Sequence, residues 1–457
     1  MSEPTDPLEH GMTLSERRLE RALLLAILLA YAVLAILYAT RTPAWQVPDE
    51  PAHYNYTRQV AESGCCPVLT AEDWDAEYLA ALTSTGFEPS RLERLDAVQY
   101  EDHQPPLYYL LAAPIYRLSN GGLTALRLFS ALLGAGGIVA IYLLARIVSH
   151  SGPVALGAAA FAAFVPQHVA ILAGAGNDSL AELIVASGMV LAVGLVCGGL
   201  PDRLRSRTPA LLGVIMGLGF VTKASTFLLG PVLVLALWLD WRAQETRRLR
   251  GLVARWAAFL IPALILGGLW WGRNIALYGW PDFMGLGRHD AVVVGQPRTA
   301  DWIAERGLGA WLADGLRITF QSFWGQFGWM GVPMPARVYR ALLAFSAVSM
   351  AGLLPLARRL PAATAGQRRA IALLVALAGL GVAAFVYYNA EFVQFQGRYL
   401  YPAMSAWALA FTGGWAGWAS LLPGRWLRWL PAAIMWGLAG LSALALWRFV
   451  VPNLPVW

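Results

Sequence analysis

The sequence predicts an all-α polytopic membrane protein. Of its 457 residues, 58% are hydrophobic and only 14% are charged, whereas about a quarter of the residues are charged in a typical soluble domain. The mean hydropathy is +0.52, and there are 20 Trp residues. Long apolar runs cross a bilayer as helices because a helix satisfies its own backbone hydrogen bonds. The net charge of +6 does not indicate a nucleic-acid partner, since basic loops are expected in membrane proteins.

Eleven apolar runs are predicted to span the bilayer. They lie near residues 22–40, 126–147, 153–174, 179–200, 209–222, 226–241, 256–276, 336–356, 370–388, 401–421 and 429–450. The runs at 209–222 and 226–241 are short for a hydrocarbon layer of about 30 Å, and they predict a tight helical hairpin with its tip at residues 222–225. Segment 105–118 opens with two prolines and contains a third, so it is predicted to be an interfacial or re-entrant helix.

The distribution of basic residues orients the chain. Excess Lys and Arg mark the cytoplasmic side, and three arginines, at 17, 18 and 21, precede the first run. We therefore expect a cytoplasmic segment, residues 1–21, followed by a single transmembrane domain, residues 22–457, whose first span is an uncleaved anchor. The long outer loops, 41–125 and 277–335, place function on the extracytoplasmic face of the cell membrane. The first of them is expected to form a cap of amphipathic helices.

Acidic residues gather at the outer ends of the spans. Asp49, Glu50 and His53 follow the first span, and two adjacent carboxylates with a histidine at a bilayer surface suit a general-base site. The alternative is the solvated start of a loop. Asp178 follows Asn177 at an outer turn, where it could cap the next helix or belong to the site.

Cations lie at the same level. Lys223 sits in an almost wholly apolar context, and an intramembrane cation is a functional candidate, although a lysine near a helix end can also snorkel to the interface. Arg273 and Arg398 lie at outer helix ends, where they could instead be interfacial anchors, and His103 lies in an acidic cluster that ends the first loop.

This set of acids and cations suits one kind of reaction. A carboxylate would remove a proton from an acceptor while fixed cations stabilise a departing phosphate. Alternatively, the acidic trio of Asp49, Glu50 and Asp178 could hold Mg²⁺ or Mn²⁺.

Two further segments are interpreted more simply. The adjacent Cys65 and Cys66 could form a vicinal disulfide or bind metal, but free thiols are expected. The aromatic, Gly-rich stretch 322–329 is a candidate second re-entrant segment.

The order of these motifs resembles the GT-C superfamily of membrane glycosyltransferases, especially protein O-mannosyltransferases and bacterial lipid A aminoarabinose transferases. The resemblance rests on Asp-Glu-x-x-His-Tyr from Asp49, Pro-Pro-Leu-Tyr-Tyr from Pro105, Arg127-Leu128, Thr222-Lys223, and Arg-Tyr-Leu-x-Pro from Arg398. It implies that Asp49 is the catalytic base and that Lys223 and Arg398 lie near a lipid phosphate. The family's Lys-Pro-Pro is replaced here by His103-Gln104-Pro105-Pro106, so one phosphate-binding lysine is missing or has become His103.

The sequence therefore predicts a glycosyltransferase that moves a sugar from a polyprenyl-phosphate donor to an extracytoplasmic lipid, glycan or protein acceptor. Inversion at the anomeric carbon is implied by the resemblance. Glu50 and His53 would orient the base or the acceptor, Asp178 would shape the site, and Arg273 and His103 would add to the phosphate site. A transporter or lipid flippase that uses Lys223 and Asp178 as coupling charges is the alternative, and a non-catalytic assembly subunit is a third possibility.

Overall fold

The computed structural model describes residues 14–455. The first thirteen residues of the predicted cytoplasmic segment 1–21 lie outside the described residues. The described chain is helical apart from one hairpin, in which β1 (Gln326–Phe327) pairs antiparallel with β2 (Val332–Pro333).

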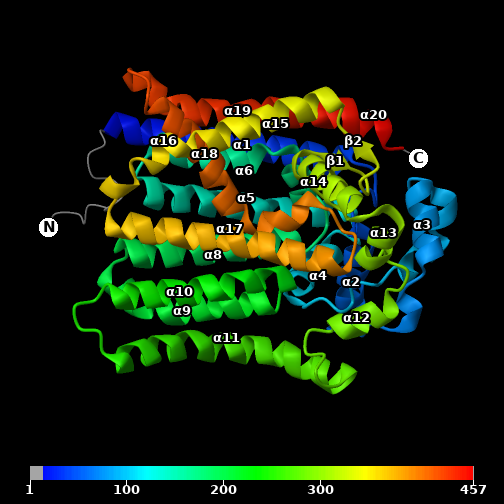
Figure 1. Ribbon diagram of the computed structural model, residues 1–457. Coiled ribbons are helices and arrows are strands. Elements are labelled where there is room, and N and C mark those ends of the chain that lie inside the picture. The colour runs from blue at the N-terminus through cyan, green and yellow to red at the C-terminus, as the bar shows by residue number, and fades with distance from the viewer. Residues whose placement is uncertain (1–13, 456–457) are drawn as a thin grey trace.

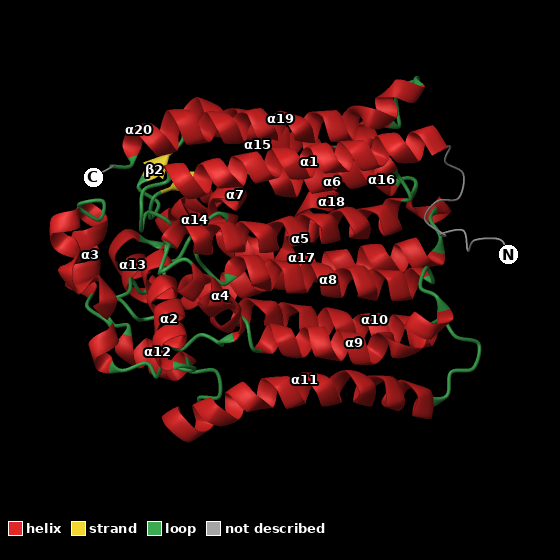
Figure 2. Ribbon diagram, turned by 180° about the vertical axis from the view of Figure 1, so that it is seen from behind, coloured by secondary structure: helices red, strands yellow, loops and turns green. Residues whose placement is uncertain are grey.

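Long helices with roughly parallel axes form a bundle, together with the short helices α7, α16 and α20 (Figures 1 and 2). They are α1 (Leu14–Arg41), α5 (Leu123–Ser149), α6 (Gly152–Phe164), α7 (Pro166–Leu172), α8 (Asp178–Cys197), α9 (Asp202–Phe220), α10 (Leu229–Arg242), α11 (Leu249–Tyr278), α15 (Ala336–Ala351), α16 (Leu353–Ala357), α17 (Ala365–Glu391), α18 (Met404–Ala419), α19 (Leu430–Ala445) and α20 (Val451–Asn453).

Shorter helices cover one end of this bundle, on the right in Figure 1. They are α2 (Glu50–Ser63), α3 (Ala76–Ser84), α4 (Leu107–Leu118), α12 (Leu286–Val292), α13 (Thr299–Arg306) and α14 (Leu308–Trp324), with 3₁₀ helices Ala71–Asp73 and Pro89–Ala97. Four more 3₁₀ helices join bundle helices within the described residues, namely Ala224–Leu228, Leu360–Ala362, Gly397–Ala403 and Arg425–Trp429. The loop 41–125 thus forms a helical cap at one end of the bundle.

Eight helices of the described chain are long and apolar enough to cross a membrane, and the pair α6–α7, bent by 67°, makes a possible ninth. The break in that pair precedes Pro166, as expected because proline disfavours helical geometry in the residue before it. The other two predicted spans correspond to α9, whose first turns carry Asp202, Arg203 and Arg205, and to α18, which has only 16 residues. The prediction of a helical membrane protein is confirmed, with eight or nine spans supported by length and composition.

The bundle packs as a layered series. Helix α11 packs on α9, α9 on α8, α8 on α5, α5 on α6, and α6 on α19. Small residues allow the closest approaches, as is usual between membrane helices. At Gly414 of α18, an added Cβ would lie 1.7 Å from the carbonyl oxygen of Ser349 on α15. The series brings the helix ends that carry the predicted site residues to one side of the molecule.

Two local expectations need comment. Segment 105–118 forms α4, a helix of 12 residues that does not span the bundle, in line with the prediction. Stretch 322–329 is not a re-entrant helix, because α14 ends at Trp324 and the chain then turns into the β1–β2 hairpin. Gly325 ends the helix with φ 166°, and Gly328 has φ +56°.

Candidate active site

A buried ion pair shapes the turn that follows the first span. Arg127 of α5 donates from Nε and Nη2 to the two carboxylate oxygens of Glu50, at 2.7 and 2.6 Å, and both side chains are almost fully buried. The same guanidinium donates to the carbonyl oxygens of Ala39, Thr42 and Pro43. Such a planar fork suits several acceptors at once. Arg127 therefore fixes the path of the chain from the end of α1 to α2.

Asp49 lies at the end of this turn, immediately before α2. Its backbone is left-handed, with φ 66°, a conformation that costs about 1–3 kcal/mol for a residue other than glycine and that is common at functional sites. Its side chain does not cap α2. Instead, Oδ1 accepts from the hydroxyl of Tyr100 at 2.8 Å, and Oδ2 accepts from Nη2 of Arg398 at 2.5 Å.

These partners set the charge of Asp49. Burial raises the pKa of the Asp49 carboxyl, but the charge of Arg398 and the hydrogen bonds from Arg398 and Tyr100 outweigh burial and bring the pKa down to about 2. The carboxyl is therefore ionised at neutral pH. About a fifth of its side chain is exposed (22%), so it can be reached from outside.

Arg398 is held by close packing of the 3₁₀ helix Gly397–Ala403 on α14. A Cβ at Gly397 would lie 2.2 Å from the backbone nitrogen of Phe323, so only glycine fits there. Gly397 donates its backbone N–H to the hydroxyl of Ser322, and Tyr401 donates to the carbonyl of Phe323. The guanidinium next to Gly397 is thus anchored on a rigid support.

A second ion pair joins Lys223 and Asp178. Lys223 follows α9 and donates from Nζ to Oδ1 of Asp178, the first residue of α8, at 2.5 Å. Asp178 does not cap α8, because the N-cap position is Asn177 and no side-chain cap is formed. Of the two alternatives for Asp178, capping is thus not observed, and the carboxylate pairs with Lys223 instead. The ammonium group of Lys223 is therefore paired within the protein and does not extend toward the interface as an isolated cation.

Polar contacts connect the two ion pairs. His53 forms a hydrogen bond through Nδ1 with the hydroxyl of Tyr109 at 2.8 Å, and Asn177 donates to the same hydroxyl at 3.5 Å. Asn177 also donates to the carbonyl of Thr222, next to Lys223. Burial lowers the pKa of His53, and the charges of both ion pairs act on it. The two ion pairs therefore lie at the same end of the bundle, close enough for the charge of Arg398 to act on Asp178.

His103 lies beside this network against a second histidine. Its ring is 4.3 Å from that of His289, centroid to centroid. Burial lowers the pKa of His103 to about 4 and that of His289 to about 4, so both are neutral at pH 7. Nδ1 of His103 contacts the carbonyl oxygen of Tyr100 at 3.1 Å and must donate to it. The free Nε2 is then an acceptor and adds no positive charge.

Asp102 is a buried acid next to His103. Its Oδ2 accepts from Gln59 at 2.8 Å, whereas its Oδ1 has no protein partner. Burial raises the pKa of Asp102 to about 8. Asp102 is therefore largely protonated at neutral pH, in contrast to Asp49.

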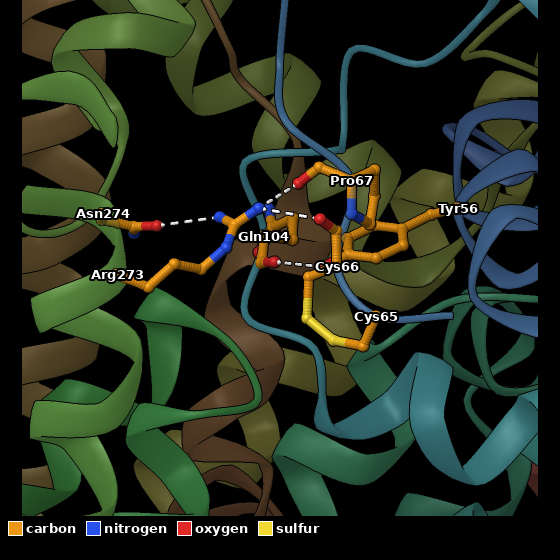
Figure 3. The surroundings of a disulfide bond; sticks show 7 residues. All are labelled: Tyr56, Cys65, Cys66, Pro67, Gln104, Arg273 and Asn274. Carbon is orange, nitrogen blue, oxygen red and sulfur yellow. Dashed lines mark hydrogen bonds between the residues drawn. A yellow bond between two sulfur atoms is a disulfide. The ribbon is translucent and has the colours of Figure 1, made fainter. Parts of the chain in front are cut away.

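Arg273 reaches from α11 to the turn that contains the two cysteines (Figure 3). Its Nη2 donates to the carbonyl oxygens of Cys66, at 3.0 Å, and Pro67, and its Nη1 donates to Asn274. Cys65 and Cys66 form a disulfide with each other, so the expectation of two free thiols was wrong.

Known proteins resemble this chain in sequence and in fold. Residues 103–271 match the model of a family described as dolichyl-phosphate-mannose-protein mannosyltransferase. The fold is similar to ArnT from Cupriavidus metallidurans in the apo state, with 17% identity over 95% of this chain and 73% of that chain and a TM-score of 0.50. The part of the chain at residues 103–271 is therefore similar to that mannosyltransferase family.

Two other solved structures align less closely. The Archaeoglobus fulgidus oligosaccharyltransferase, crystallised with Zn and sulfate, is 16% identical over 93% of this chain and 52% of that chain, with a TM-score of 0.47. The S. cerevisiae protein O-mannosyltransferase Pmt1–Pmt2 complex, bound to the sugar donor, is 17% identical over 62% of this chain and 36% of that chain, with a TM-score of 0.41. The chain thus spans about half the length of the archaeal protein. No curated protein sequence matches it significantly.

The residues present do not fit a divalent-metal site formed by the acidic trio. Asp49 faces Arg398, Glu50 faces Arg127, and Asp178 faces Lys223. Each carboxylate is thus already neutralised by a different cation, and no three His, Cys, Asp or Glu side chains converge within residues 14–455.

The candidate site contains three residues that the sequence analysis did not identify. Tyr100 holds Asp49, Tyr109 links His53 to Asn177, and His289 packs on His103. Tyr109 lies within the Pro-Pro-Leu-Tyr-Tyr motif, so the motif itself was a signal for it. His289 follows no motif, and only the fold brings it to the site.

Proposed function

We propose that this protein transfers a sugar from a polyprenyl-phosphate donor to an acceptor outside the cytoplasm. The observation that carries the proposal is the pairing of one accessible carboxylate, Asp49, with the guanidinium of Arg398, beside a second pair formed by Lys223 and Asp178. The description of the matched family names a dolichyl-phosphate sugar, and we extend that class of lipid phosphate to the donor. The acceptor would be a lipid, a glycan or a protein.

The donor phosphate would bind between Lys223 and Arg398. Both cations keep some exposure, with 18% and 10% of their side chains accessible. Charge-assisted hydrogen bonds to phosphate are stronger than those between neutral groups. The bound phosphate would share each cation with its aspartate.

Asp49 would act as the general base of an inverting displacement. It removes the proton from the acceptor nucleophile, which attacks the anomeric carbon from the face opposite the phosphate. A new bond forms between the acceptor and the anomeric carbon, and the bond from that carbon to the phosphate oxygen breaks. The electron pair leaves with the polyprenyl phosphate, whose charge Lys223 and Arg398 stabilise.

Donor binding would also activate the base. In the free protein, Arg398 keeps the pKa of Asp49 at about 2, too low for an efficient base at neutral pH. A phosphate that attracts the same guanidinium weakens its bond to Asp49 and raises the pKa of the carboxyl. The base would therefore gain strength only when the leaving group is in place.

The other site residues would position these groups. Glu50 would hold the turn before Asp49 through Arg127, and His53 would orient the acceptor beside Tyr109. Asp178 would position Lys223. Arg273 would add positive charge at longer range while it binds the Cys66 turn, and neutral His103 would accept a hydrogen bond instead of offsetting charge.

The proposed topology keeps the cytoplasmic segment 1–21 and one transmembrane domain. It has eleven spans, with α9 and α18 added to those supported above because both run alongside bundle helices (Figures 1 and 2). The site then faces away from the cytoplasm, because the arginines of the short inner segments lie at the opposite end.

The test is a transfer assay with the purified chain in proteoliposomes. Synthetic polyprenyl-phosphate sugars are offered with lipid, glycan and peptide acceptors, and mass spectrometry detects the glycosylated product and the released polyprenyl phosphate. Donor hydrolysis without acceptor is measured too, since water can replace the acceptor. Movement of intact donor across the bilayer, with neither product nor hydrolysis for any donor, would instead support the transporter alternative.

A further inference from the structure

A large cavity lies at the end of the bundle opposite the active site. Its volume is about 560 Å³, and it is lined mainly by apolar side chains of α17 and α18. Helix α16 and the loop that follows it form the adjoining wall, and the turn between α5 and α6 forms the base. The helices leave a hollow because they present small residues to it, among them Ala378, Ala406, Ala410 and Gly413.

The cavity has the length of one membrane leaflet. Its lining on α18 extends from Ala406 to Ala416, and ten residues of α-helix rise about 15 Å. This distance is about half of the hydrocarbon thickness of about 30 Å. Val375, which also lines the cavity, is 66% exposed, so the cavity opens sideways from α17 toward the surrounding lipid.

Basic residues mark the mouth of the cavity. The loop 357–369 contains four arginines and no acidic residue. Arg359 lines the cavity and is exposed, and it donates through Nη2 to the carbonyl of Ser420. The nearby Arg368 and Arg369 also donate to backbone carbonyls. Within residues 14–455, none of these three arginines forms an ion pair with a carboxylate.

We propose that this cavity is a binding site for an anionic phospholipid of the leaflet opposite the active site. An acyl chain would lie between α17 and α18, and the phosphate would contact Arg359. Basic pockets between helices at the cytoplasmic side are suited to anionic head groups. This inference does not depend on the proposed glycosyltransferase activity.

Other occupants fit the cavity less well. A soluble metabolite would leave most of the apolar lining unused. The polyprenyl chain of the donor would have to reach the cavity from a phosphate held at the other end of the bundle, and it would leave Arg359 without an anion.

The test uses the full chain purified in a mild detergent. Native mass spectrometry measures retention of phosphatidylglycerol and of phosphatidylcholine with the same acyl chains. Arg359→Gln removes the charge, and Ala410→Phe fills the hollow. Arg250→Gln, an exposed arginine at the same end of the bundle, and Ala372→Phe, on the exposed side of α17, are the matched controls. Thermal unfolding without added lipid shows that each variant is folded.

We expect phosphatidylglycerol to bind at least about fivefold more tightly than phosphatidylcholine, the factor that matches one basic residue near a head group. Arg359→Gln should reduce the affinity for phosphatidylglycerol by about that factor, and Ala410→Phe should abolish the lipid adduct. Both controls should retain the lipid as the parent does. Equal retention of the two lipids would overturn the proposal, as would equal effects of a variant and its control. Displacement of the bound lipid by undecaprenyl phosphate at equal concentration would identify the donor chain as the occupant instead.

Discussion

The replacement Asp49→Asn tests the role of the proposed base separately from that of the phosphate site. Asparagine keeps the size of the side chain. Its carbonyl oxygen can accept from Arg398 while its amide group donates to the oxygen of Tyr100, so the turn should remain folded. It cannot take a proton from the acceptor. Positioned general bases contribute about 10²–10⁴ in rate, which corresponds to about 2.7–5.4 kcal/mol of transition-state stabilisation. We expect the transfer rate to fall by that factor.

The donor affinity of Asp49→Asn should not fall with the transfer rate. Despite burial, the charge of Arg398 lowers the pKa of Asp49 to about 2, so the ion pair favours the ionised carboxylate. Without that negative charge, Arg398 is held less strongly at position 49 and can bind the donor phosphate more readily. The donor Kd of Asp49→Asn should therefore be unchanged or lower than that of the parent.

The assay combines single-turnover transfer with equilibrium binding of a fluorescent polyprenyl phosphate. Asp178→Asn is the control, since it also removes a carboxylate from a cation of the site but not the proposed base. It should change donor affinity more than the rate of the chemical step. Turnover of Asp49→Asn within about tenfold of the parent would refute the role of the base, and a loss of affinity equal to the loss of rate would show that Asp49 only holds the site together.

Three more outcomes follow from the same contacts. Lys223→Ala should raise the donor KM by about tenfold or more, since a lost charge-assisted bond to phosphate is worth about 1.5–3 kcal/mol, and an unchanged KM would remove Lys223 from the phosphate site. Arg127→Ala should lower the free energy of unfolding by about 3–5 kcal/mol, because it leaves a buried carboxylate unpaired, and a Tm like that of the parent would contradict this. Asp102 has a pKa of about 8 in the folded protein, so the folded state holds an extra proton above pH 4 and stability should fall toward pH 8 by at most about 1.4 kcal/mol per pH unit. Asp102→Asn should reduce this slope in denaturation curves, and an identical pH dependence would be evidence against the buried neutral acid.

Much of the fold could be predicted from the sequence, because apolar runs of membrane length have few alternatives to helices. The short hairpin around residues 222–225, the short helix α4 and the outer cap were also predictable from lengths and prolines. The number of spans was less certain. Charges in the first turns of α9 and the 3₁₀ helix before α18 shorten the apolar segments, and a sequence window does not show where regular helix begins.

The sequence predicted that the charged site residues lie at one end of the bundle, but it did not predict which of them form ion pairs. Loop charge placed Asp49, Asp178, Lys223 and Arg398 at one end, and the structure brings these four together in two ion pairs. The partner of Glu50 was not evident, because a buried arginine in α5 looks like an ordinary basic residue at a span end. Burial also keeps His103 neutral, and burial of a loop side chain depends on elements distant in the sequence.

The resting protein presents balanced charges where its substrate would enter. Lys223 and Arg398 are each already satisfied by an aspartate, so a lipid phosphate must compete with a carboxylate for every contact. Ordinary phospholipids, which vastly outnumber a rare lipid carrier in a bilayer, would gain little from such an exchange. A headgroup that also offers a sugar to the neighbouring tyrosines and histidines would gain more. We infer that these internal ion pairs reduce the binding of bulk membrane phospholipids at the entrance.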